Sequence, residues 1–187
     1  RISRHFVGLP AAQVPQGIDS ALKSVVSALV FERALVALFS RDQSTFQITR
    51  RYAVASFDPV LAIDEPTPVS RMPWLAAQML ARTVVVVSSP DELPPEALHE
   101  REALFRQNVA WVAYYPLDVG GTVLGAVGFL GRHQWKPDHG EGLLVLSQLF
   151  ASGLDRKRAD DELRQTHRLT ELVGEVSRRF IDLPPPE

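Results

Sequence analysis

Cysteine is absent from the 187-residue chain. Without a thiol, the protein can form no disulfide, thiolate metal site, iron–sulfur cluster or thioether bond to a chromophore, and it has no cysteine nucleophile. Long apolar runs are absent as well, because no segment approaches the roughly 18 consecutive apolar residues that a membrane-spanning helix needs. Since thiol-free sequences fit a reducing compartment, we expect a cytoplasmic localisation and no membrane span in this fragment.

An excess of one charge is also lacking. The 20 Lys and Arg residues nearly balance the 22 Asp and Glu residues, for a net charge of −2. Proteins that bind nucleic acid usually carry a basic footprint, so we expect no nucleic-acid partner. The histidines do not form a ligand set: His133 and His139 flank Trp135, with only Asp138 close by. We therefore expect no metal site.

Motifs for catalysis are missing too. The sequence contains no nucleophile elbow and no glycine-rich loop that follows a strand and opens a helix. The Gly120-Gly121 pair is typical of a two-residue hairpin turn rather than a phosphate cradle, because no helix begins after it. We expect this fragment to be regulatory and not an enzyme.

What the sequence does contain is a regular order of amphipathic segments, with 45% hydrophobic residues to build a core. Hydrophobic periodicity predicts the following elements: a helix from Ile18 to Leu29, strands at Ala34–Phe39 and Phe46–Val54, a short helix at Trp74–Ala81, a strand at Thr83–Val87, a helix at Glu96–Gln107, strands at Trp111–Leu117 and Thr122–Leu130, and a long helix from Gly140. This order predicts an α+β fold. We expect an antiparallel sheet of five or six strands, with helices on both faces and a long C-terminal connector helix.

Two details of this prediction concern loops and helix faces. Ser56–Pro73 carries four prolines and should be an irregular surface loop, because proline supplies no amide donor. In the short helix after it, we expect Trp74, Ala77 and Met79 or Leu80 to face inward. In the helix at Glu96–Gln107, the expected apolar contacts are Leu98 and Leu104.

The segment Val109–Phe129 resembles the GAF domain family. Pro116-Leu117, the Gly120-Gly121 turn and Gly125 match that family's strand, turn and glycine-containing strand. Phe31–Ala34 and the long C-terminal helix are similar to family features as well, and the resemblance covers Ile18–Leu163. It implies a GAF-like sensory module of a bacterial signalling protein. The bilin-attachment cysteine, the cysteines of methionine sulfoxide reduction and the Asn-Lys-Phe-Asp-Glu set of cyclic-nucleotide binders are absent.

The resemblance also implies a ligand pocket between one sheet face and the segment that covers it. By similarity to ligand-binding members, Val112, Tyr114, Ala126, Gly128 and Leu130 point toward this pocket. Strand alternation places Leu124 on the same face as Ala126, and the small side chains at 126 and 128 leave room for a guest. The alternative is that these residues are ordinary core, because pocket linings are mostly apolar.

Arg71 and Trp74 stand where the proline-rich loop meets the short helix. An arginine beside an aromatic ring can hold an anionic or planar ligand. The alternative is a surface arginine that covers an anchoring tryptophan. The ligand itself, and hence any cofactor, is not identified by the sequence.

The ends of the chain suggest a larger protein. We expect residues 1–17 to be an upstream connector, 18–142 the sensory domain, and 143–187 a connector with the start of a second repeat, because Arg1–Pro10 resembles Glu175–Pro184. A seam with steps of four and three predicts a coiled coil and a homodimer; it consists of Leu169, Val173, Val176, Phe180 and Leu183. The alternative is that this seam packs on its own domain.

The function hypothesis is a ligand-binding sensor that signals through its terminal helices to adjacent domains of the same chain. The output would be a histidine kinase of a two-component system, a cyclic-di-nucleotide enzyme or a transcription activator. A ligand-free dimerisation or spacer module is the main alternative. A PAS-type sensor has a similar sheet, but the long helix before the first strand argues against it.

Overall fold

The structure of the chain is a computed structural model that describes residues 6, 8–29, 31–54, 65–133 and 139–181; the side chains at 174 and 177–181 are outside this description. Within these residues, six antiparallel strands form one sheet in the order β3-β2-β1-β6-β5-β4. The strands are β1 Arg33–Phe39, β2 Thr45–Ala53, β3 Thr67–Pro68, β4 Val85–Val87, β5 Trp111–Val119 and β6 Thr122–Gly131.

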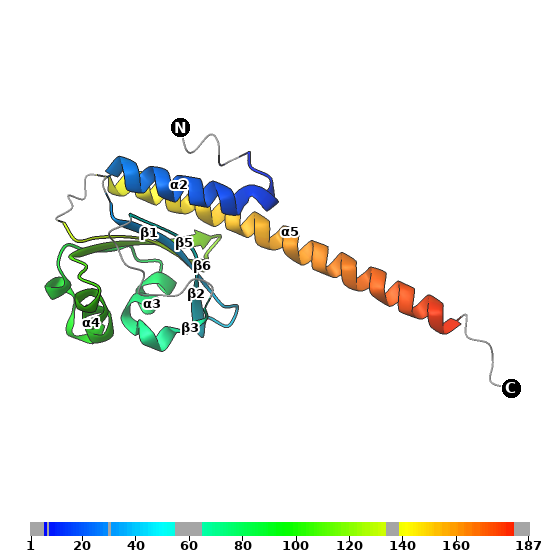
Figure 1. Cartoon of the computed structure of the whole chain (residues 1–187). Coiled ribbons are helices and arrows are strands. Elements are labelled where there is room, and N and C mark those ends of the chain that lie inside the picture. The colour runs from blue at the N-terminus through cyan, green and yellow to red at the C-terminus, as the bar shows by residue number, and fades with distance from the viewer. Residues whose placement is uncertain (1–5, 7, 30, 55–64, 134–138, 182–187) are drawn as a thin grey trace.

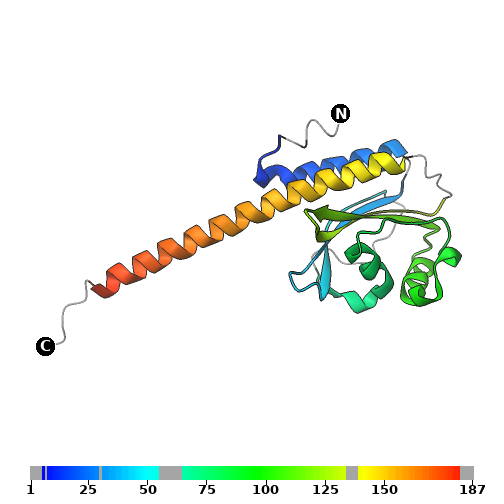
Figure 2. The same cartoon turned by 180° about the vertical axis from the view of Figure 1, so that it is seen from behind.

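Helices cover both faces of this sheet, as the sequence predicts. Their bounds are α2 Val14–Leu29, α3 Pro73–Leu80, α4 Leu98–Arg106 and α5 Gly140–Ile181, with short 3-10 turns at Ala11–Gln13, Val69–Arg71, Pro90–Glu92 and Pro95–Ala97. Helices α2 and α5 lie side by side on one face, whereas α3 and α4 lie on the other (Figure 1). The same arrangement is seen from behind, where α5 projects far beyond the sheet (Figure 2).

The prediction of an irregular loop at Ser56–Pro73 is only partly correct. Within its described part, Thr67–Pro68 forms the edge strand β3, which pairs with Thr45 and Phe46. A proline is tolerated there because the outer side of an edge strand needs no amide donor. Residues 56–64 of this loop lie outside the described residues, as do residues 1–5, 7 and 182–184 of the two similar decapeptides.

The core on the α2–α5 face is aromatic. Phe31 lies between Trp111 and Phe129, with ring centroids 5.0 and 5.5 Å away. Phe6 packs against Phe150 of α5 at 5.4 Å. Such tilted pairs add about 0.5–1.5 kcal/mol each to the effect of apolar burial. The first turns of α5 are therefore an integral part of the domain core.

Two residues that the sequence predicts to face inward, Ala77 and Leu98, are exposed in the structure. In α3 the buried residues are Ala76 and Met79, while Ala77 is exposed, because successive helical residues are turned by about 100° and the face in contact with the sheet passes through 76 and 79. In α4, Leu104 is buried as predicted. Leu98 is 52% exposed, because it lies beside the buried face instead of on it.

The prediction that Leu124 shares a face with Ala126 is also wrong, because β6 contains a bulge. Leu117 pairs with Gly125, and Asp118 pairs with Val123, so Leu124 is the extra residue. An inserted residue interrupts the period of two. Leu124 consequently packs in the core under α2 and α5, and Ala126 packs in the core under α3.

Gly125 is predicted to be essential for the contact between β6 and β1. A Cβ atom at this position would lie 2.0 Å from the carbonyl oxygen of Ala37 and 2.8 Å from the Cα of Leu38, which are backbone atoms in a central strand. We expect Gly125→Ala to lower the free energy of unfolding by about 1–3 kcal/mol or more, because overpacking there forces the strands apart. Urea unfolding followed by circular dichroism measures this change.

Gly142→Ala is the matched control, because nothing lies within 4 Å of a Cβ atom at that helical position. Alanine is the better helix former, so the control should be at least as stable as the wild-type protein. Equal stabilities of the two variants would contradict the close β1–β6 contact.

Candidate functional site

An apolar cavity lies between the sheet and α3. Its volume is about 60 Å³. The lining comes from β1, β2, β5 and β6 on one side and from α3 and the residue before it on the other. The lining residues are Leu35, Ala37, Phe39, Phe46, Ile48, Met72, Leu75, Ala76, Met79, Tyr114 and Ala126. A space of this size and character accepts a small apolar group.

Tyr114 forms one wall of the cavity, and Gly128 makes room for its ring. A Cβ atom at position 128 would lie 2.3 Å from Cε1 of Tyr114. The space that a side chain at position 128 would occupy is therefore already filled by the ring of Tyr114. Burial raises the pKa of Tyr114 to about 12, with an opposite contribution from nearby Arg33, so the phenol is neutral at physiological pH.

Arg33 itself is buried at the start of β1. Its Nη1 donates a hydrogen bond to Oε1 of Gln107 at 2.9 Å, which ties β1 to the end of α4. Burial lowers the pKa of Arg33 to about 10, which leaves the guanidinium charged at neutral pH. Arg33 therefore stays charged in the physiological range, and its hydrogen bond to Gln107 holds β1 to the end of α4.

A smaller pocket adjoins the cavity between α3 and α4, and it contains a buried carboxyl group. Glu100 is 3% exposed, and its Oε1 accepts a hydrogen bond from the backbone N–H of Leu75 at 3.0 Å. That amide belongs to the first turn of α3, where helical N–H groups have no partner within the helix. Oε2 of Glu100 has no hydrogen-bond partner among the described residues. Met72, Trp74 and Tyr114 line the same pocket.

The structure brings together most of the residues that the resemblance selects. Val112, Tyr114, Ala126 and Leu130 belong to one buried cluster on the α3 face, and Trp74 packs against it. Ala126 lines the apolar cavity, Val112 and Trp74 line the smaller pocket, and Tyr114 lines both. Gly128 lies under the tyrosine ring, as described above. Arg71 is exposed in the turn before α3 and lines neither space.

Sequence reasoning misses Glu100, which lies in a helix that appears polar. The available signal is its spacing: Ala97, Glu100 and Leu104 are three and four residues apart and are all buried. A charged residue on the inward face of a helix needs a partner or a function. Reasoning from strand alternation alone also misses the α3 side of the cavity, above all Met72, Leu75 and Met79.

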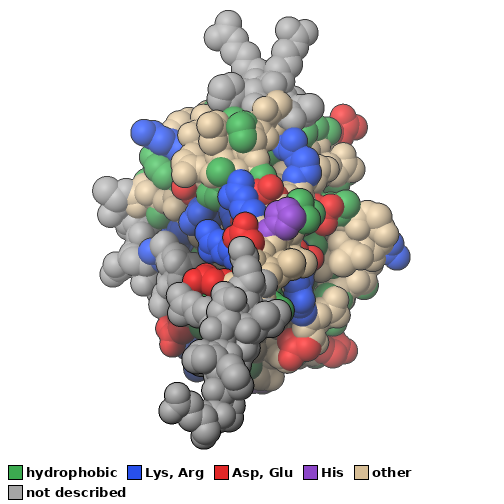
Figure 3. Space-filling model, turned by 90° about the vertical axis from the view of Figure 1, so that its right-hand side faces the viewer, with side chains coloured by type: hydrophobic (Ala, Val, Ile, Leu, Met, Phe, Trp, Pro, Cys, Tyr) green, Lys and Arg blue, Asp and Glu red, His purple; other side chains and the backbone are tan. Residues whose placement is uncertain are grey.

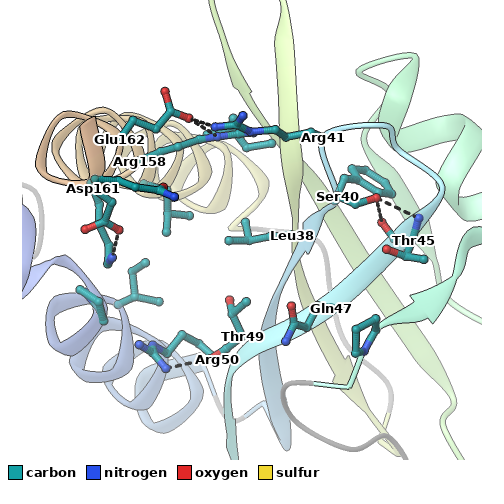
Figure 4. A pocket seen from close by; sticks show the side chains of 18 residues that line it. Leu38, Ser40, Arg41, Thr45, Gln47, Thr49, Arg50, Arg158, Asp161 and Glu162 are labelled. Carbon is teal, nitrogen blue, oxygen red and sulfur yellow. Dashed lines mark hydrogen bonds and ion pairs between the residues drawn. The ribbon is translucent and has the colours of Figure 1, made fainter. Parts of the chain in front are cut away.

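A larger hollow of about 800 Å³ lies on the opposite side, between the β1–β2 hairpin and the helices α2 and α5 (Figure 4). Its cationic residues are Arg41, Arg50, Lys157 and Arg158, and each has an acidic partner. On the face from which α5 projects, basic and acidic side chains lie interspersed (Figure 3). Only two carboxylates, those of Asp161 and Glu162, line this hollow beside the four cations. We take the cavity under α3 as the candidate site, because apolar side chains of the sheet and α3 surround it, whereas partly exposed charged side chains bound the hollow.

Ion pairs across this hollow join the β1–β2 hairpin to α5. Arg41, in the turn after β1, forms an ion pair with Glu162, which also lies 3.5 Å from Nε of Arg158. Figure 4 shows Arg41 reaching toward these two residues. Exposed pairs of this kind contribute at most about 1 kcal/mol each to stability. They can still align the helix with the hairpin.

The described part of the chain contains neither a metal-ligand cluster nor a membrane-spanning helix. No three His, Asp or Glu side chains of this part of the chain are grouped so that they could hold a metal ion. In the same part, no helix combines the length and the hydrophobicity that crossing a membrane requires.

Comparison with known proteins places this geometry in a structural context. The sequence matches no protein-family model and no curated protein. Solved structures do match: the phycoerythrobilin-bound GAF domain of a cyanobacterial phytochrome is 14% identical, with a TM-score of 0.70, and the match covers 86% of this chain and 94% of that one. A bacteriophytochrome from the photosynthetic bacterium R. palustris is 13% identical, with a TM-score of 0.69 and coverage of 98% and 42%.

The chromophore-binding domain of a bacteriophytochrome from R. palustris is 12% identical, with a TM-score of 0.68 and coverage of 85% and 60%. This chain thus spans less than two thirds of the length of the two bacteriophytochrome chains, and nearly all of the isolated GAF domain. The sheet order, the helices on both faces and these likenesses agree, and the chain has the fold of a GAF domain.

Proposed function

We propose that this chain is a non-catalytic sensory module of a bacterial signalling protein, located in the cytoplasm. It binds a small molecule in the cavity between the sheet and α3. The observation that carries this proposal is the double role of α5. Leu143, Leu146 and Phe150 of this helix are buried in the domain core, whereas its second half projects away from the domain. A rigid helix of this kind is suited to carry a change of state to an adjacent domain.

Transmission requires that the ligand has different affinities for two states of the module. Strands β1 and β2 connect the two sides, because Leu35, Ala37 and Ile48 line the cavity while the hairpin between these strands holds Arg41 against Glu162. A ligand that shifts the hairpin would change the position of α5. The output domain would be a histidine kinase, a cyclic-di-nucleotide enzyme or a transcription activator in the same protein.

Dimerisation through the projecting helix is the second part of the proposal. Leu169, Val173 and Val176 are 57%, 65% and 51% exposed on the part of α5 beyond the sheet. The sheet of the same domain does not cover them, which favours a partner helix over packing within the chain. Phe180 and Leu183, the last members of the seam, have no described side chains. A second copy of this helix would bury the seam as in a coiled coil.

A ligand-free spacer module is the alternative, and one observation favours it. The cavity of about 60 Å³ is small compared with the 300–1,000 Å³ that is usual for ligand pockets, and the space above Gly128 is occupied by Tyr114. A binding function therefore requires that α3 or the residue before it moves on binding.

Filling the cavity distinguishes these two functions. Ala126 is 7% exposed and lines the cavity, so Ala126→Leu should occupy the space that a ligand needs. We expect metabolites that raise the melting temperature of the wild-type protein to have no effect on this variant, because a ligand stabilises only the state that binds it. Thermal-shift screening of a metabolite library measures this effect.

Ala77→Leu is the matched control, because it makes the same change on the exposed side of α3. It should keep every shift that the wild-type protein shows. If no compound shifts the wild-type protein, the spacer function is correct. Shifts that persist in Ala126→Leu would place the ligand elsewhere.

The dimer is tested by a charge in the seam. Leu169→Glu places a carboxylate where a partner helix would bury it, so we expect the mass from light scattering to fall from that of a dimer to that of one chain. Thr170→Glu adds the same charge at the adjacent position, outside the seam, and should remain dimeric. A wild-type protein that is monomeric at micromolar concentration would contradict the proposed dimer.

A further inference from the structure

The residues around the cavity also indicate the chemistry of the ligand. We propose that Glu100 selects a ligand that carries a positively charged amino group on a small apolar body. This inference rests on the proposed function, because it assumes that the cavity under α3 is the binding site. It adds the class of ligand and the residue that recognises it.

The first argument is that capping α3 does not explain a glutamate at this position. Glu100 is 97% buried, and only one of its two carboxyl oxygens has a partner among the described residues, namely the amide of Leu75. A neutral acceptor such as the side chain of glutamine would accept the same hydrogen bond. A buried carboxylate with an unpaired oxygen destabilises the folded protein, so its presence needs a further reason.

The second argument is the surroundings of this carboxyl group. Among the described ion pairs, none includes Glu100. The pocket that it lines is otherwise formed by apolar residues and by the aromatic rings of Trp74 and Tyr114. Aromatic faces attract cations, and a carboxylate repels anions. A primary ammonium group satisfies the carboxylate and the rings together, whereas a carboxylate or phosphate ligand is disfavoured.

The third argument is the connection between the two spaces. The pocket at Glu100 has room for about 10 Å³, enough only for a head group. Met72, Leu75 and Tyr114 line both this pocket and the cavity of about 60 Å³. Met72 is half-buried at the start of α3, and an unbranched methionine changes rotamer readily. Its movement would join the two spaces, with the amino group at Glu100 and the apolar body beside Ala126.

The experiment uses three probes that share a phenyl ring and differ in charge: 2-phenylethylamine, 2-phenylethanol and 3-phenylpropionate. Calorimetric titration measures their affinities for the wild-type protein, Glu100→Gln and Ala126→Leu. We expect the amine to bind the wild-type protein at least tenfold more tightly than the alcohol, and the acid not to bind. Glu100→Gln should lose this preference while its melting temperature stays near that of the wild-type protein, because the amide oxygen still accepts from Leu75.

Trp74→Leu provides a second test if Glu100→Gln does not fold. It removes an aromatic face from the same pocket and should reduce the affinity for the amine more than the affinity for the alcohol. Equal binding of amine and alcohol by the wild-type protein, an unchanged preference in Glu100→Gln, or no binding of the amine overturns the selection by Glu100. The proposed function is judged separately, by whether compounds from the metabolite library lose their effect in Ala126→Leu.

Discussion

Burial of the central strands on both faces is the constraint on which the structure depends. Ala34, Leu35 and Val36 of β1 are all buried, as are the first seven residues of β5. Alternate side chains of these strands supply two separate cores, one under α2 and α5 and one under α3 and α4. A strand that is apolar on both faces cannot leave either face in water, so both helical layers are required.

The two cores have different characters, and the glycines of β6 contribute to both. Gly131 leaves space for the indole of Trp111, which belongs to the aromatic core under α5. Gly128 leaves space for the ring of Tyr114 in the core under α3. The aromatic core is filled with interlocking rings, whereas the other retains a cavity next to methionines. The densely packed face therefore carries α5, and the face that retains a cavity carries the candidate site.

Local patterns predict most of the fold because they depend on neighbouring residues. Alternation in β5 separates Trp111 and Ala113 from Val112 and Tyr114, and the structure confirms this division. The position of Leu124 is not predictable in this way, because a bulge depends on how β6 pairs with β5. The prediction that Ala77 faces inward fails for a related reason. The apolar pattern of α3 is nearly uniform, and only contact with the sheet decides which side is buried.

The candidate site is less predictable than the fold, since its chemistry depends on contacts between distant residues. Glu100 and Leu75 are 25 positions apart, and nothing in either local sequence indicates that a carboxylate of α4 would cap α3. Strand alternation predicts that Gly128 leaves room for a guest, but that space is taken by the ring of Tyr114 from the adjacent strand. Sequence patterns identify which face carries the site, whereas the free volume in it depends on how side chains from several elements pack.

Under the proposed function, the separation of the candidate site from α5 limits how a signal can pass between them. The cavity and α5 lie on opposite faces of the sheet, so a ligand cannot touch the helix directly. The proposed signalling therefore requires the strands themselves to move, and β1 is well placed because it lies at the centre of the sheet, between β2 and β6. Its residues Leu35 and Ala37 face the cavity, Val36 faces the core under α5, and the turn after it holds Arg41 against Glu162. The exposed Arg41–Glu162 pair is weak, and a weak contact is the kind that a small ligand can rearrange.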